Sequence, residues 1–149
     1  HDCSKRVSVA PFTEEGSVMA GYTVQKLTEV EDQAPNFGFD PEIYSIRMAR
    51  NPLNCEHCGI TLSHLSPNFR VPFGHTHNRQ EEIYILVDGS ARMKLDDDVV
   101  ELEQWTAVRV PPETMRAIES GPEGARFIVV GAPNTGPGDG NVEQGWWND

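Results

Sequence analysis

Two histidines and a carboxylate near the middle of the chain have a spacing that suits metal binding. His75 and His77 are separated by one residue, and Glu82 follows after a short polar break, at the start of an alternating apolar run that ends at Gly89. In a strand, residues i and i+2 point to the same face with Cα atoms roughly 7 Å apart, so both imidazoles can reach one point. Two neutral imidazoles and one carboxylate suit zinc, manganese, nickel or non-haem iron. The segment therefore predicts a divalent transition-metal site.

This segment resembles the first motif of the cupin family, which runs His-x-His, three or four residues, Glu, six residues, Gly. Glu82 is separated from Gly89 by six residues, whereas the neighbouring Glu81 does not fit. The resemblance implies an all-β fold, an antiparallel double-stranded β-helix or jelly-roll barrel, with the site inside it. It also assigns His75, His77 and Glu82 as the metal ligands.

The second cupin motif is degraded in this chain. Cupins usually continue with Gly, five residues, Pro-x-Gly, two residues, His, three residues and Asn. The proline is retained as Pro111, but the two glycines and the asparagine are replaced by Trp105, Glu113 and Ser120. Arg116 stands where the fourth metal ligand, a histidine, is expected, and arginine stays protonated and cannot ligate a divalent cation. At most three protein ligands remain, the composition of a facial triad with open coordination positions.

Arg116 supports two interpretations that the sequence does not separate. As a structural group, it would form a salt bridge with Glu82 or Glu113 and replace the charge of the metal. As a functional group, its guanidinium would hold the carboxylate or phosphate of an anionic substrate through two parallel hydrogen bonds. Tyr84 is a second candidate for substrate binding, as an acid or hydrogen-bond donor.

Several other residues are expected to be structural. His64 lies in a predicted strand, where a single histidine is more often structural than a ligand, although it could line the cavity. Trp105 and Met115 are expected in the apolar wall of the barrel. The Cys-x-x-Cys pair Cys55-Glu56-His57-Cys58 lacks the second pair of a closed zinc site and precedes a strand, so two reduced thiols in a loop are expected. With Cys3 as the third cysteine, no disulfide framework is expected.

The remaining sequence reads as many short strands without a convincing helical period, which indicates a β-sandwich or barrel. Strands are predicted at 43–48, 59–65, 82–87, 91–95, 99–102, 107–110, 115–118 and 125–130, with turns at Asp96–Asp98 and Gly121–Gly124. In the strand at 82–87, Glu82, Tyr84 and Leu86 should share one face. The predicted organisation is an N-terminal arm with short strands at 1–40, the barrel at 41–131, and an irregular tail at 132–149 that packs on the barrel or a partner through Trp146 and Trp147.

Composition and charge limit the partners. The chain has 149 residues without an internal repeat, which predicts a single domain. Its formal net charge of −11 argues against a nucleic-acid partner, because such proteins need a basic surface. It has no apolar run that could span a bilayer and no leader pattern at its start, so we expect a cytoplasmic protein without a membrane partner. The cupin resemblance implies a homodimer.

Two functional classes follow from the sequence. The first is a metal-dependent small-molecule enzyme, such as a dioxygenase, isomerase or epimerase, in which His75, His77 and Glu82 hold the metal and Arg116 orients an anionic substrate. The second is a non-catalytic binding or sensing domain that holds a small ligand without metal. The intact first motif favours the first class, and the missing fourth ligand favours the second.

Overall fold

The protein is described by a computed structural model that covers residues 17–19 and 21–149, so the expectations for Cys3 and for residues 1–16 of the N-terminal arm lie outside the described residues. A hairpin of β1 (Ser17–Met19) and β2 (Tyr22–Val24) precedes two short 3-10 helices, η1 (Leu27–Glu29) and η2 (Ala34–Phe37). Neither they nor any other helix in this part of the chain has the length and apolar character needed to cross a membrane.

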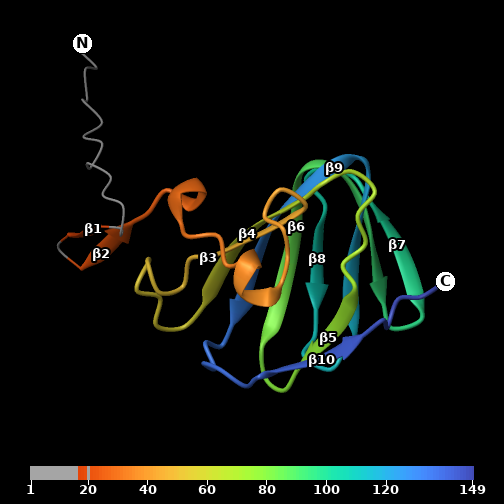
Figure 1. Cartoon of the computed structure of the whole chain (residues 1–149). Helices are drawn as coiled ribbons and strands as arrows, with labels where there is room; N and C mark the ends of the chain where they lie inside the picture. The colour runs from red at the N-terminus through yellow and green to blue at the C-terminus, as the bar shows by residue number, and fades with distance from the viewer. Residues whose placement is uncertain (1–16, 20) are drawn as a thin grey trace, which may run out of the picture.

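Eight further strands form one antiparallel sheet, which curls on itself (Figure 1). They are β3 (Tyr44–Met48), β4 (Gly59–Leu65), β5 (Phe73–His77), β6 (Glu81–Leu95), β7 (Asp98–Leu102), β8 (Ala107–Val110), β9 (Arg116–Ala132) and β10 (Gly140–Gln144). The long strands β6 and β9 pair along their whole length, β9 also pairs with β4 and β5, and β6 also pairs with β7 and β8. This arrangement confirms the predicted all-β antiparallel fold.

The two long strands bend where the sequence predicted a chain reversal. A turn was expected at Gly121–Gly124, but β9 continues through this segment while the register of the β6–β9 pair shifts near Leu86 and Gly89. Bulges of this kind add twist and bend a strand, so the glycines and the proline mark a bend. Gly89 has φ +83°, and a Cβ atom there would lie 2.0 Å from the carbonyl oxygen of Gly124. The glycine of the first motif is therefore needed where β6 and β9 approach closely.

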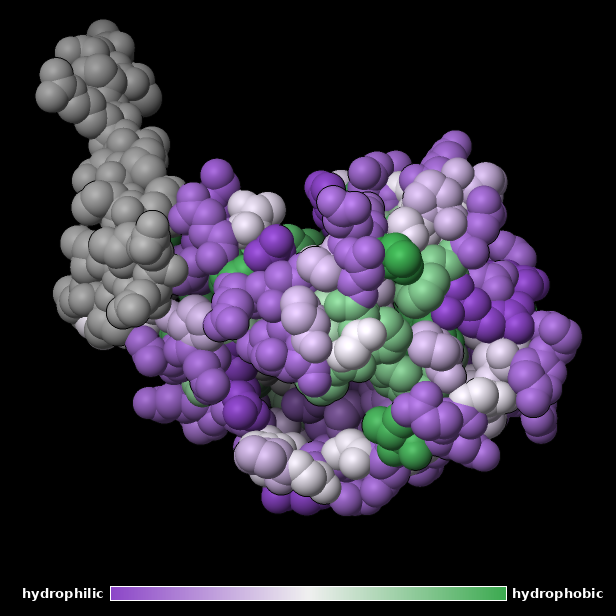
Figure 2. All heavy atoms as spheres, viewed as in Figure 1, coloured by the Kyte–Doolittle hydropathy of each residue, from purple (hydrophilic) through white to green (hydrophobic). Residues whose placement is uncertain are grey.

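Alternation along β6 divides its side chains between the barrel interior and the surface, as predicted. Tyr84 and Leu86 are 4% and 0% exposed, whereas Ile83, immediately before Tyr84, is 38% exposed. The inward residues join one apolar cluster with Leu65, Met93 and residues of the other strands. Burial of each large aliphatic side chain stabilises the fold by about 1.5–3 kcal/mol. On the face shown in Figure 2, hydrophilic residues cover most of the surface and hydrophobic ones gather towards the centre.

The C-terminal segment at 132–149, predicted to be irregular, contains a strand of the barrel sheet. β10 (Gly140–Gln144) pairs antiparallel with β5, and this pairing depends on partners far away in the sequence. Trp147 is 5% exposed, and the guanidinium of Arg70 lies 4.3 Å from its ring centroid. Trp146 lies against β5, because a Cβ atom on Gly74 would be 2.6 Å from its indole ring. Both tryptophans pack on the barrel and hold β10 beside the strand that carries the histidines.

Candidate metal site

The three predicted metal ligands converge inside the barrel. β5 carries His75 and His77, and Glu82 lies near the start of β6. The Nε2 atoms of His75 and His77 lie 3.3 Å and 3.1 Å from the same carboxylate oxygen, Oε1 of Glu82. One ligand atom from each residue lies within 4.8 Å of the others. The structure therefore places the predicted donors around one point.

The spacing of these donors fits a single ion. Ligands about 2.1 Å from one ion and about 100° apart are separated by roughly 3.2 Å, close to the two nitrogen–oxygen distances seen here. The side chains of His77 and Glu82 are 14% and 12% exposed, so the site is recessed but accessible. Burial raises the pKa of Glu82, but hydrogen bonds from His75 and His77 outweigh it and hold this pKa well below its usual range. Glu82 is thus ionised, as a metal ligand must be.

Tyr84 supports the carboxylate from within the barrel. Its hydroxyl donates a hydrogen bond of 2.9 Å to Oε1 of Glu82. Burial and the negative charge of Glu82 raise the pKa of Tyr84 well above its ordinary value, so the phenol stays protonated and acts as a donor. Its contact with Glu82 is direct, whereas its role in substrate binding remains a prediction.

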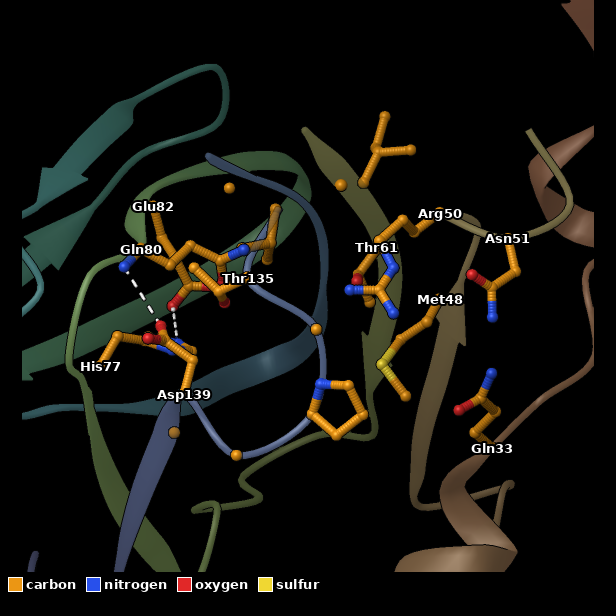
Figure 3. Close-up of a pocket in the computed structure, with 18 residues that line it drawn as sticks. Gln33, Met48, Arg50, Asn51, Thr61, His77, Gln80, Glu82, Thr135 and Asp139 are labelled. Carbon is orange, nitrogen blue, oxygen red and sulfur yellow. Dashed lines mark hydrogen bonds and ion pairs between the residues drawn. The ribbon is translucent and has the colours of Figure 1, made fainter. Parts of the chain in front are cut away.

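Two cavities adjoin the site, and His77 and Glu82 line both of them. Their volumes are about 390 Å³ and about 930 Å³. Figure 3 shows the smaller one, with the dashed interactions of His77 on one side and Arg50 and Thr61 on the other. A small molecule can therefore reach the candidate ligands from the cavities.

Arg116 lies behind the carboxylate. It is fully buried, and it lies opposite His75 in the pairing of β5 with β9. Its Nη1 atom is 3.6 Å from Oε1 of Glu82, and its Nη2 atom donates a hydrogen bond of 2.7 Å to the carbonyl of Pro111. The residues that line the two cavities do not include Arg116. This geometry favours the ion pair of Arg116 with Glu82 over the anion clamp. The anion clamp remains a prediction.

Asp139, in the loop before β10, is a site residue that the sequence reasoning missed. Its Oδ2 atom lies 3.2 Å from Nδ1 of His77, and its carboxylate accepts hydrogen bonds from the backbone N–H groups of Arg79 and Gln80. Although desolvation raises the pKa of Asp139, these backbone hydrogen bonds and His77 lower it below its ordinary value. A carboxylate that accepts the Nδ1–H proton leaves Nε2 free to bind a metal. Only the pairing of β10 with β5 brings Asp139 to His77, and no local sequence signal indicates that pairing.

Replacing Asp139 with asparagine is expected to weaken divalent-metal binding by about 10- to 100-fold, the usual effect of losing the carboxylate behind a ligating histidine. The measurement is a Co²⁺ titration followed by visible absorption, which reports the coordination sphere directly. Asp97→Asn, at the exposed turn between β6 and β7, is the matched control. Equal affinities for Asp139→Asn and the wild type would show that Asp139 does not orient His77.

The other predicted residues lie away from the site. Trp105 was expected in the apolar wall, but it is 71% exposed in the turn before β8, with φ +70°. The cupin motif has glycine at this position, and this backbone conformation favours glycine. His64 alternates with Ser63, which lines the larger cavity, so it faces away from that cavity. Met115 packs behind β5, beside Gly74.

The Cys-x-x-Cys pair lies in the loop between β3 and β4. Cys55 and Cys58 are free thiols, and Cys58 is exposed. Burial, followed by the neighbouring thiol of Cys58, raises the pKa of Cys55. A raised pKa disfavours the thiolate form that metals and disulfide exchange require. These cysteines therefore add nothing to the candidate site.

Comparisons with known proteins bear on the fold. No family model and no curated protein matches the sequence. A cupin protein from Bacteroides fragilis is 19% identical, with a TM-score of 0.63 over 80% of this chain and 91% of that one. The Streptomyces protein PAC13, solved with uridine, is 13% identical, with a TM-score of 0.65 over 85% and 92% of the two chains. A Klebsiella pneumoniae protein with a double-stranded β-helix domain is 18% identical, with a TM-score of 0.55 over 69% and 83%.

These similarities identify the architecture. The chain has the cupin fold, an antiparallel double-stranded β-helix, as the resemblance of its first motif predicted. Its His75, His77 and Glu82 form a group that could hold a metal ion inside that fold.

Proposed function

We propose that this protein binds one divalent transition-metal ion through Nε2 of His75, Nε2 of His77 and the carboxylate of Glu82, next to a cavity that accepts a small organic molecule. The observation that carries the proposal is the convergence of both imidazoles on one oxygen of an ionised carboxylate, at 3.3 Å and 3.1 Å. An ionised carboxylate and two imidazoles that face one point form a donor set for zinc, iron, manganese or nickel.

The cavities next to the three donors support a role in small-molecule chemistry. Three protein ligands leave coordination positions open, and His77 and Glu82 line both cavities. A bound divalent ion would polarise an oxygen of a ligand placed there. The similar fold of PAC13, solved with uridine, is consistent with a barrel that holds an organic molecule. Metal-dependent dioxygenases and isomerases are the reaction classes that we propose to assay first.

A second candidate function is a metal-free ligand-binding domain. The observation that favours it is the contact between the fully buried Arg116 and Glu82, with 3.6 Å between Nη1 and Oε1. A cation at this place supplies part of the charge that a metal would bring, and it repels a divalent ion bound nearby. In that case the barrel would hold its ligand without an ion.

The test is a metal titration of the chelator-treated protein with Co²⁺, Fe²⁺, Mn²⁺, Ni²⁺ and Zn²⁺, followed by calorimetry and, for Co²⁺, by absorption. We expect one ion per chain and a Co²⁺ spectrum that reports nitrogen and oxygen ligands. The variant His64→Ala, which changes a histidine that faces away from the cavity, should bind the same ions equally well. A wild-type chain that takes up none of the five ions would refute metal binding and leave the metal-free domain as the function.

A further inference from the structure

The two cavities beside the candidate metal site differ in chemistry. We name the smaller one, of about 390 Å³, the polar lobe, and the larger one, of about 930 Å³, the apolar lobe. Thr61, His77 and Glu82 line both lobes, so the two meet at the candidate metal ligands. A molecule bound at the metal can therefore extend into both lobes.

The polar lobe contains an arginine that faces the candidate site. Its lining includes Gln33, Arg50, Asn51, Gln80 and Thr135. In Figure 3, Arg50 extends beside Thr61, across the cavity from His77 and Asp139. The Nη1 atom of Arg50 donates a hydrogen bond of 2.6 Å to the amide oxygen of Asn134. Because this partner is neutral, it orients the guanidinium without cancelling its charge, and the remaining donors suit a carboxylate.

The apolar lobe is lined by aromatic and aliphatic side chains. Phe39 lies edge-on to Tyr44 with ring centroids 5.1 Å apart, and 6.2 Å from the ring of Phe73. Ile46 and Ile118 also contribute to this wall. Burial and the charge of Glu82 raise the pKa of Tyr44 to about 12, so its hydroxyl stays neutral. A charged group would lose its hydration here, whereas a flat or branched hydrocarbon would gain contacts.

We infer that the ligand of this site is a small amphipathic carboxylate, with its carboxylate in the polar lobe against Arg50 and its hydrocarbon body in the apolar lobe. The inference rests on the proposed function in one respect: Glu82 and Asp139 also line the polar lobe, so a metal ion is needed, together with Arg50, to offset their charge. A singly charged head group fits this balance better than a doubly charged phosphate. Arg50 thus takes the role that the sequence suggested for Arg116.

The test compares three probes with matched parts, 3-phenylpropanoate, 3-phenylpropan-1-ol and propanoate, by calorimetry on the metal-loaded protein. We expect 3-phenylpropanoate to bind at least tenfold more tightly than either the alcohol, which lacks the charge, or propanoate, which lacks the hydrocarbon body. Arg50→Gln should remove the advantage over the alcohol while leaving the affinity for the alcohol unchanged. Arg126→Gln, on the exposed outer side of β9, is the control and should bind all three as the wild type does.

The opposite results would overturn the inference. They are no measurable binding of 3-phenylpropanoate at millimolar concentration, equal binding of acid and alcohol, or an Arg50→Gln variant that keeps the preference for the acid. The metal content of every sample, measured on the same preparations, separates this failure from failure of the proposed function. A protein that holds its ion in both the wild type and Arg50→Gln but ignores the probes would refute the amphipathic ligand alone.

Discussion

Replacing His77 with alanine is expected to weaken divalent-metal binding by well over a hundredfold. The variant loses one of three protein ligands, and it also separates the site from Asp139, which holds Nδ1 of His77 at 3.2 Å. Loss of a partner behind the ligand alone costs about 10- to 100-fold in affinity, so loss of the ligand itself must cost more. Competition titration with a coloured chelator measures affinities over this range.

The controls for His77→Ala separate coordination from folding. His64→Ala removes a histidine from β4 without touching the cavity and should keep the wild-type affinity. Unfolding in urea should show that the metal-free His77→Ala protein is folded, since the side chain of His77 is partly exposed. If the folded variant bound Co²⁺ as tightly as the wild type, the ion would have to be held by other groups, and the assignment of this site would be wrong.

The part of the site that the sequence predicted is the part set by local alternation. His75 and His77 on one strand, and Glu82 and Tyr84 on the next, share their faces because side chains alternate along a strand. The family motif then added that both strands belong to one barrel, in which β5 and β6 each pair with β9. For that reason three candidate ligands could be named in advance, and the distances between their side chains show that they converge.

The features that the sequence did not predict depend on pairing between distant segments. Asp139 and β10 lie in a segment rich in glycine and proline, and only pairing with β5 orders them beside His77. Arg50 follows β3 without any periodic signal, and it reaches the cavity because β3 pairs with β4. The prediction of a turn at Gly121–Gly124 was wrong for the same reason, because pairing with β6 keeps β9 extended through that segment.

Glu82 is the electrostatic centre of the site, since three hydrogen-bonding groups and one guanidinium surround one of its oxygens. His75, His77 and Tyr84 lie within 3.3 Å of Oε1, and Nη1 of Arg116 lies at 3.6 Å. A metal ion and Arg116 therefore compete for the same negative charge. Glu82 binds a metal ion or pairs with Arg116 according to which cation it attracts more strongly. Substituting Arg116 removes one of the two and so shifts this equilibrium.

Replacing Arg116 with methionine is expected to destabilise the metal-free protein by about 3 kcal/mol and, at the same time, to tighten metal binding at least tenfold. Removal of one partner of a buried ion pair typically costs about 3–5 kcal/mol, and the carbonyl of Pro111 also loses one of its two donors, keeping the backbone N–H of Thr114. The Nε and Nη1 atoms of Arg116 have no hydrogen-bond partner among the described residues, which places the cost at the lower end of this range. The gain in metal affinity follows because a divalent ion no longer faces a buried cation. Urea unfolding and a Co²⁺ titration measure the two effects.

Arg126→Met is the matched control for Arg116→Met, because it removes an exposed arginine from the same strand. It should change neither quantity by more than the effect of an ordinary surface substitution, about 0.5 kcal/mol. If Arg116→Met left stability unchanged but abolished binding of an anionic ligand, the anion clamp would be correct and the ion pair wrong. If the wild type bound no metal and Arg116→Met bound one ion, Arg116 would be the group that replaces the metal charge, because removing one guanidinium would have restored a site whose three ligands are already in place.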